Sequence, residues 1–275
     1  MTGKARSAAK PYPVLPSSVY VWRGFKSATQ TYAQFAQFLG SVFVPACALL
    51  QPAVGLRAYL PTMVPQDGKP AALPDQTALM FWATPAAHDL ANQAIAVRIY
   101  QNLHGDAYDM ARSHTPEVPV SIAAAAGTLT AEQPYFLLDQ PADWMLGAAQ
   151  HLVGARRAAL PAADFLAQAY AWAAAFRARP PAGVDGALVC CGNDYAVAWV
   201  HGPRRSPKLD AALDGLAALT VPALRAAPRA LDLPAGLWSA WPGLDLTQDT
   251  CLNIQLARPP VARPTPGKPG KPVKR

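Results

Sequence analysis

The segment ATQTYAQFAQFLGSVFVPACALLQPAVG, residues 28–55, returns in altered form as ALPAADFLAQAYAWAAAFRARPPAGVDG, residues 159–186. Each copy follows a short apolar segment that contains one glycine, Gly24 in VYVWRGF and Gly154 in QHLVGAR. Phe35 and Phe165 lie at the same separation from these glycines. Repetition on this scale is typical of a structural unit that occurs twice. The sequence therefore predicts two similar domains, residues 18–141 and residues 142–258.

Hydrophobic periodicity predicts the same order of elements in both halves. Runs rich in β-branched and aromatic residues predict strands at 19–25, 56–63, 79–84 and 134–138, then within 144–155 and at 187–191, 195–201 and 249–257. Apolar residues at helical spacing predict helices at 29–50 and 85–103, then within 162–179 and at 208–226. Pro45 is expected to bend or end the first helix. Gly192 and Asn193 predict a tight hairpin, because both residue types tolerate positive φ.

The order strand, helix, strand, strand, helix, strand, written twice, resembles the dimeric α/β-barrel superfamily in the form of a fused pseudo-dimer. The resemblance rests on element order over residues 18–258 and on no signature motif. It implies an α+β fold of two tandem ferredoxin-like units whose antiparallel sheets pack against each other. That superfamily includes cofactor-independent monooxygenases, isomerases, haem-handling enzymes and non-catalytic ligand binders. The resemblance therefore leaves the function open.

The formal net charge of +7 is concentrated at the two ends of the chain. Residues 1–10 hold three basic groups and residues 258–275 hold six, with no acidic group in either segment. The remaining 24 − 9 = 15 basic groups face 17 acidic groups, so residues 11–257 carry a net charge of −2. Residues 259–275, rich in Pro, Gly and Lys, are predicted to be a disordered basic tail. A near-neutral body predicts no specific nucleic-acid partner.

Several classes of chemistry lack their sequence signals. The four cysteines, Cys47, Cys190, Cys191 and Cys251, show no CxxC pair, so we expect reduced, buried thiols. No histidine pair has metal-ligand spacing, and no phosphate-binding or dinucleotide-binding glycine motif is present. We therefore expect no metal and no cofactor. The N-terminus has no apolar signal region, and residues 35–50 are interrupted by Gly40, Ser41 and Pro45. These features predict a cytoplasmic protein without a membrane partner.

Four residues on predicted strands are candidates for ligand binding in a cavity between the two sheets. Trp199 and His201 share one strand face with Tyr195, while His151 lies in the middle of an apolar strand. A histidine there could act as a base on a carbon acid, or it could be a core histidine with its hydrogen bonds satisfied. Arg23 is an uncommon charge on an apolar strand, so it either reaches a carboxylate or ligand or lies at a solvated edge.

The predicted site is asymmetric between the halves. Aligning the two halves matches His201 with Ala83, Trp199 with Phe81 and Arg23 with Val153. Polar and aromatic residues of one half therefore occupy positions at which the other half has different, mostly small or aliphatic residues. Residues 108–114 form a second, polar segment in a loop, where ligand contacts often occur; the favoured alternative is a plain surface loop.

Two functions fit these observations. The favoured prediction is a non-catalytic binding protein that holds a small apolar ligand or a protein partner, for example an inhibitor or a toxin-neutralising protein. It is favoured because no acid–base constellation is shared by both halves, and no catalytic residue can be named. The alternative is a cofactor-independent enzyme, an oxygenase or isomerase, acting on a hydrophobic small molecule in the cavity between the two units.

Overall fold

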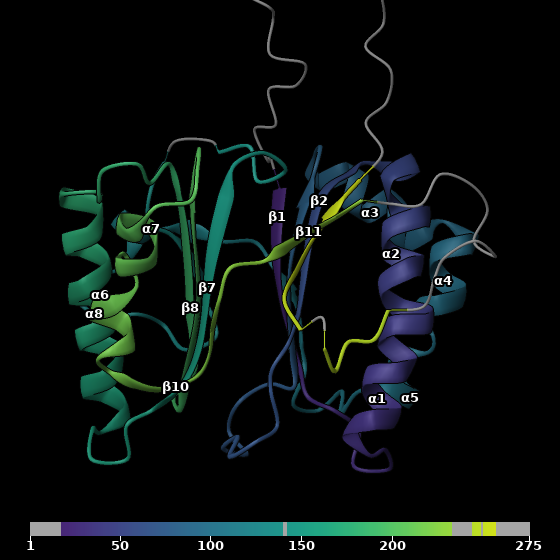
Figure 1. Ribbon diagram of the computed structural model, residues 1–275, viewed down its shortest axis with the longest axis horizontal. Coiled ribbons are helices and arrows are strands. Elements are labelled where there is room, and N and C mark those ends of the chain that lie inside the picture. The colour runs from purple at the N-terminus through teal and green to yellow at the C-terminus, as the bar shows by residue number, and fades with distance from the viewer. Residues whose placement is uncertain (1–17, 140–141, 233–243, 249, 257–275) are drawn as a thin grey trace, which may run out of the picture.

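The computed structural model describes residues 18–139, 142–232, 244–248 and 250–256. Two six-stranded sheets pack face to face at the centre, and helices cover the outer face of each sheet (Figure 1). The predicted α+β class, with sheets built mainly from antiparallel strands, is confirmed. Residues 259–275, the predicted disordered tail, lie outside the described residues.

The first sheet has the strand order β11-β12-β2-β3-β1-β4. Its members are β1 (Ser18–Gly24), β2 (Leu56–Met63), β3 (Gln76–Trp82), β4 (His114–Glu117), β11 (Arg229–Asp232) and β12 (Leu252–Gln255). The second sheet has the order β10-β7-β9-β8-β6-β5. Its members are β5 (Val120–Ser121), β6 (Pro134–Phe136), β7 (Ala148–Arg156), β8 (Gly186–Cys191), β9 (Tyr195–Gly202) and β10 (Thr220–Ala226). Neighbouring strands are antiparallel except for the pairs β11–β12 and β5–β6.

The two sheets exchange strands. Within them, β4-β1-β3-β2 of the first half has the same order as β10-β7-β9-β8 of the second. β6 then pairs with β8, and β12 pairs with β2. The prediction that residues 134–138 and 249–257 are the fourth strands of their own halves is wrong. β4 and β10 occupy that position, and the two predicted strands extend the sheet of the other half.

The sequence patterns of β4 and β10 explain this error. β4 reads HTPE, a short polar segment with a proline, and lacks a strand pattern. β10 follows leucines at helical spacing, so residues 208–226 are predicted as one helix, whereas α7 (Pro207–Ala211) and α8 (Asp214–Ala217) end before Thr220. Thr220, Val221 and Pro222 then begin a strand at the sheet edge, where a proline is tolerated because no neighbour needs its missing N–H.

One continuous helical segment covers the first sheet. It runs through α1 (Tyr32–Phe38), the π-helical η1 (Leu39–Phe43), α2 (Val44–Leu50) and the 3₁₀-helical η2 (Gln51–Val54). Thr31 and Gln34 form a capping box at its start, and Gly55 ends it at φ 115°. Pro45 follows the π turn, which fits a residue that cannot donate a backbone hydrogen bond. By length and composition this helix could cross a membrane, but over half of it is buried against the protein.

The other helices complete the two outer layers (Figure 1). α4 (Ile95–Gln101) lies beside α2, α3 (Pro85–Gln93) packs against η2, and α5 (His104–Ala107) lies near α1, where the sequence predicts one helix over residues 85–103. The break falls at Ala94, whose ψ of 129° is extended. α6 (Ala162–Ala178), α7 and α8 cover the second sheet. The hairpin between β8 and β9 forms as predicted, with Gly192 N donating to Tyr195 O, although no positive φ occurs at Gly192 or Asn193.

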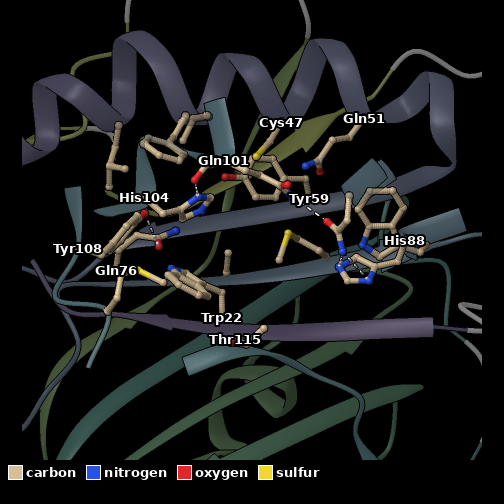
Figure 2. A pocket seen from close by; sticks show the side chains of 18 residues that line it. Trp22, Cys47, Gln51, Tyr59, Gln76, His88, Gln101, His104, Tyr108 and Thr115 are labelled. Carbon is tan, nitrogen blue, oxygen red and sulfur yellow. Dashed lines mark hydrogen bonds between the residues drawn. The ribbon is translucent and has the colours of Figure 1, made fainter. Parts of the chain in front are cut away.

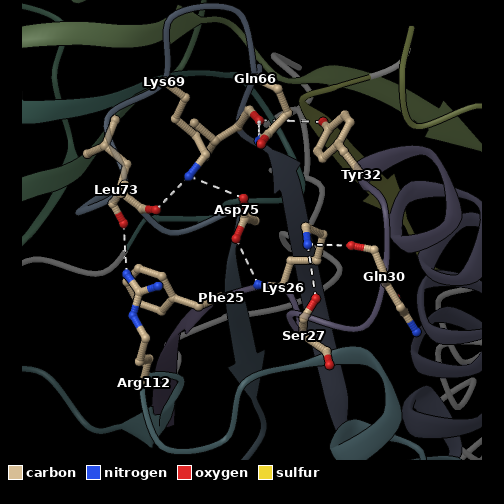
Figure 3. Close-up of polar contacts among 12 residues, drawn as sticks. Phe25, Lys26, Ser27, Gln30, Tyr32, Gln66, Lys69, Leu73, Asp75 and Arg112 are labelled. Atoms are coloured by element: carbon tan, nitrogen blue, oxygen red, sulfur yellow. Dashed lines mark hydrogen bonds and ion pairs between the residues drawn. The ribbon is translucent and has the colours of Figure 1, made fainter.

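A polar network fixes the long connection between β2 and β3 (Figure 3). Asp75 accepts a hydrogen bond from Lys26 N at 2.7 Å and forms an ion pair with Lys69 Nζ at 3.2 Å. Arg112 donates to Ala71 O at 2.7 Å and lies over the ring of Phe25, 4.1 Å from its centroid. Because Asp75 immediately precedes β3, these contacts set the position at which that strand begins.

Candidate functional site

A cavity of about 350 Å³ lies between the first sheet and its helical cover (Figure 2). Alternate residues of β3 form its floor, since successive side chains of a strand face opposite sides: Gln76, Ala78, Met80 and Trp82. Every fourth residue of the helix from α1 to η2 forms its roof: Leu39, Phe43, Cys47 and Gln51. Trp22 and Tyr59 add aromatic walls from β1 and β2. The result is a largely apolar chamber with a few polar side chains, the usual character of a small-molecule site.

His104 lines one end of the cavity. Its Nδ1 lies 2.7 Å from the carbonyl oxygen of Gln101. A carbonyl oxygen only accepts hydrogen bonds, so Nδ1 carries the proton and Nε2 keeps its lone pair. Burial lowers the pKa of His104, and the backbone hydrogen bond opposes this only in part. The imidazole is therefore neutral and able to accept a proton at neutral pH.

Tyr108 lies beside His104, with the two rings stacked at 5.6 Å. Its hydroxyl donates to Gln76 Oε1 at 3.2 Å, and burial raises its pKa far above the ordinary range, so the group stays protonated. Gly24 makes room for this ring, because a Cβ at that position would lie 2.4 Å from Cε1 of Tyr108. This end of the cavity thus offers one proton acceptor and one hydroxyl donor.

The other end holds a second polar group of side chains. Burial lowers the pKa of His88, whose ring stacks on Tyr20 at 3.8 Å. Asn92 Nδ2 lies 3.4 Å from His88 Nε2, near the limit for a hydrogen bond, and Asn92 Oδ1 accepts from Gln101 Nε2 at 2.7 Å. Trp82 Nε1 is buried and has no hydrogen-bond partner among the described residues.

In the second half, smaller or aliphatic side chains occupy the corresponding positions. Gly24 lies opposite Gln76, and Gly154 lies opposite Ala196, so matching the two glycines aligns both sheets. The residues that match Trp22, Tyr59, Gln76 and Trp82 are then Leu152, Ala187, Ala196 and Gly202. These smaller or aliphatic side chains pack under α6 with Phe165 and Phe176. The halves are asymmetric, and the first half carries the polar and aromatic groups on its helix-facing side.

The predicted ligand residue Arg23 lies on the opposite face of β1, toward the second sheet. It is fully buried; Nη1 donates to Val21 O at 2.8 Å, and Nη2 donates to Glu132 O at 3.1 Å. Its Nε lies 3.3 Å from Glu132 Oε2, which is also 3.3 Å from His114 Nε2. Of the alternatives left open for Arg23, the structure shows contact with a carboxylate.

His151 and Trp199 meet between the two sheets. His151 is fully buried; Nε2 lies 3.0 Å from Thr77 Oγ1 and Nδ1 lies 2.8 Å from Ala198 O. Its ring stacks on Trp199 at 4.2 Å. These contacts satisfy both ring nitrogens, as in the alternative reading of a core histidine.

His201 lies at the end of β9, with Nδ1 2.6 Å from Asp185 Oδ1 and Nε2 2.6 Å from Leu146 O. The aligned sheets match His201 with Phe81 and Trp199 with Leu79, so the predicted matches with Ala83 and Phe81 are shifted by two positions. Arg23, His151, Trp199 and His201 are all absent from the lining of the cavity. A ligand role for them between the sheets stays a prediction.

The sequence contained part of the signal for the cavity. Tyr108 and Met110, from the polar segment 108–114, do line it. The sequence does not predict Gln76 and Ala78 as cavity residues, because the predicted strand begins at residue 79. His88 and His104 belong to no recognisable motif. Within the described ranges, no group of three or more His, Cys, Asp or Glu side chains could hold a metal ion, and all four cysteines are buried and form no disulfide.

Comparison with known proteins gives remote structural likenesses only. No protein-family model and no curated protein sequence matches the chain. Among solved structures, it is similar to a putative monooxygenase from Lactobacillus acidophilus NCFM, with 9% identity, a TM-score of 0.31, and coverage of 76% of this chain and 90% of that one. A putative monooxygenase from Fusobacterium nucleatum subsp. nucleatum ATCC 25586 has 7% identity, a TM-score of 0.30 and coverage of 76% and 88%. An anthrone oxidase-like protein has 8% identity, a TM-score of 0.29 and coverage of 78% and 90%.

All three neighbours are described as oxidising enzymes or as similar to one. Against this finding, the prediction of a non-catalytic binding protein is wrong, and it is not carried further. At these identities and TM-scores the likenesses carry no argument about substrate or residues. The function is therefore argued from the cavity.

Proposed function

We propose that the protein is a cofactor-independent enzyme of the oxygenase or isomerase type, acting on a hydrophobic small molecule in the cavity of its first half. The observation that supports this most is His104, a neutral imidazole fixed through Nδ1 inside an apolar chamber. A neutral imidazole in a site of this kind has the free lone pair that general base catalysis requires. The cavity lies under the helices of one half rather than between the two units.

The common step of both reaction types is removal of a proton from an acidic C–H group beside a carbonyl. His104 Nε2 takes the proton, and the electron pair stays on the substrate as an enolate. The Tyr108 hydroxyl stays protonated and lies beside His104; it exchanges its hydrogen bond to Gln76 Oε1 for one to the enolate oxygen. In an isomerase the proton returns to another carbon. In an oxygenase the anion reacts with dioxygen, so that a CH₂ group and O₂ become a C=O group and water.

We also propose the finer architecture that the superfamily resemblance implies, two tandem ferredoxin-like units forming a fused pseudo-dimer. Support comes from the shared strand order, β4-β1-β3-β2 and β10-β7-β9-β8. One unit keeps a cavity, while the other is filled and serves as its structural partner. A cytoplasmic location and the absence of membrane or specific nucleic-acid partners remain part of the proposal.

The test measures exchange of deuterium from D₂O into 2-tetralone, a fused-ring ketone with an acidic C–H group. The exchange is monitored by NMR under nitrogen. The wild-type protein should accelerate exchange, and His104→Gln should slow the protein-catalysed rate by about 100-fold or more, since general bases contribute that much. Oxygen uptake in air then separates the oxygenase from the isomerase. Unchanged exchange in His104→Gln would contradict the proposed role of His104.

A further inference from the structure

The cavity has the shape of a slot that follows β3. From Gln76 to Trp82 the strand advances about 20 Å at about 3.3 Å per residue. The roof from Leu39 to Gln51 advances about 18 Å at 1.5 Å per residue. The two linings have similar lengths, and Figure 2 shows the helix running along the sheet. A compact ligand would leave part of the slot without contact, whereas a slender one fills it.

Hydrogen-bonding groups gather at the two ends of this slot. Gln76 begins the floor, with Tyr108 and His104 beside it, and Trp82 ends the floor beside His88 (Figure 2). The long contact between Asn92 and His88 is weak enough for a ligand to replace. Trp82 Nε1 is a buried donor without a partner in the described structure, and an unsatisfied buried donor is stabilised by a ligand acceptor.

The floor of the slot is apolar at its middle, where Ala78 and Met80 lie. Ala78 stands between Gln76 and Met80 on the floor, and it is 2% exposed. Any larger side chain at residue 78 would project into the slot between its two polar ends. Ala78 thus controls whether one molecule can reach both ends at once.

We infer that the slot takes an elongated, mostly apolar molecule with a hydrogen-bonding group at each end, one toward Gln76 and one toward Asn92 and Trp82, and that Ala78 sets the permitted length. The inference rests on the proposed function for placing the substrate in this cavity. It adds a substrate class and a residue that determines specificity.

Equilibrium binding under nitrogen tests this inference without turnover. The probes are 4,4′-dihydroxybiphenyl, 4-hydroxybiphenyl and the short 4-methylphenol, followed by quenching of tryptophan fluorescence. The wild-type protein should bind the diol more tightly than 4-hydroxybiphenyl. Asn92→Ala should weaken binding of the diol about fivefold, because one hydrogen bond is lost. The affinity for 4-hydroxybiphenyl should change by less than about twofold.

Ala78→Phe should weaken binding of both biphenyls at least about tenfold. Binding of 4-methylphenol should persist, and this also shows that the variant is folded. Ala78→Val is the milder variant, and Ala171→Phe on the exposed side of α6 is the matched control. Equal binding of the diol by wild type and Ala78→Phe would overturn the length rule, and equal loss of both biphenyls in Asn92→Ala would overturn the two-ended ligand. Absence of all binding would overturn both. If hydrogen exchange into 2-tetralone persists in any of these cases, the proposed function stands without the inference.

Discussion

His151 is a histidine kept neutral in the interior. It is fully buried between the sheets, with its Nδ1 proton donated to Ala198 O. Burial lowers its pKa to about 3, and the backbone hydrogen bond opposes this only in part. The unfolded chain takes up a proton near the ordinary value of about 6.5, whereas the folded protein does not. The stability linked to His151 is therefore complete above that value and is lost as pH falls toward 3.

We predict that the free energy of unfolding falls by about 1 kcal/mol per pH unit below pH 6 because of His151 alone. His151→Gln should lose this part of the pH dependence. The measurement is urea denaturation of both proteins between pH 7 and pH 4.5, with the difference in slope as the readout. The carboxylates contribute equally to both proteins and cancel. If the free energy of unfolding changed with pH equally in both proteins, His151 would take up its proton in the folded state as well, and the prediction would be wrong.

Gly24 and Gly154 occupy matching positions in β1 and β7, but they leave room for different neighbouring side chains. A Cβ at Gly24 would meet the ring of Tyr108 at 2.4 Å, whereas a Cβ at Gly154 would meet Thr220 Oγ1 at 2.5 Å. Both alanine variants should lower the free energy of unfolding by about 1–3 kcal/mol, the usual result of overpacking. Gly24→Ala should also weaken binding of 2-tetralone by displacing Tyr108.

Fluorescence titration of the two variants checks this prediction, with Gly154→Ala as the matched control. Gly154→Ala should bind 2-tetralone like the wild-type protein. Equal losses of binding in the two variants would mean that the effect comes from general destabilisation and not from the ring of Tyr108.

Strands with strong local patterns were predictable, and those defined by distant partners were not. β2 was predicted at its observed bounds, because Leu56 to Met63 is apolar and flanked by turn residues. β4 and β10 owe their strand conformation to pairing with β1 and β7, which no local pattern records. The cavity was missed for a similar reason. Its residues come from β1, β2, β3, the first helix and α3 to α5, and only the fold brings Gln76, His88 and His104 together.

At the scale of the whole molecule, the exchange of strands makes the halves mutually dependent. β6 covers the edge of β8, and β12 covers the edge of β2. Separation would expose both edges and the apolar side chains that meet between the halves, among them Phe81 and Trp144, whose ring centroids lie 5.2 Å apart. Unpaired edges and apolar faces favour aggregation.

We predict that residues 18–141 and 142–258, expressed separately, do not form stable soluble domains, while their co-expression restores a complex with the secondary structure of the whole chain. Circular dichroism and size-exclusion chromatography measure this. Cooperative unfolding of residues 142–258 alone, at the melting temperature of the full chain, would show that the second half needs no exchanged strand.

The central claim is that a ligand enters the first-half cavity and not the space between the sheets. The most direct measurement is a titration of ¹⁵N-tryptophan-labelled protein with 2-tetralone, followed through the indole N–H signals. Trp22 and Trp82 line the cavity, Trp199 lies between the sheets beside His151, and Trp172 lies on α6. We predict that the signals of Trp22 and Trp82 shift while those of Trp199 and Trp172 stay fixed; movement of Trp199 with Trp22 and Trp82 unchanged would contradict the claim.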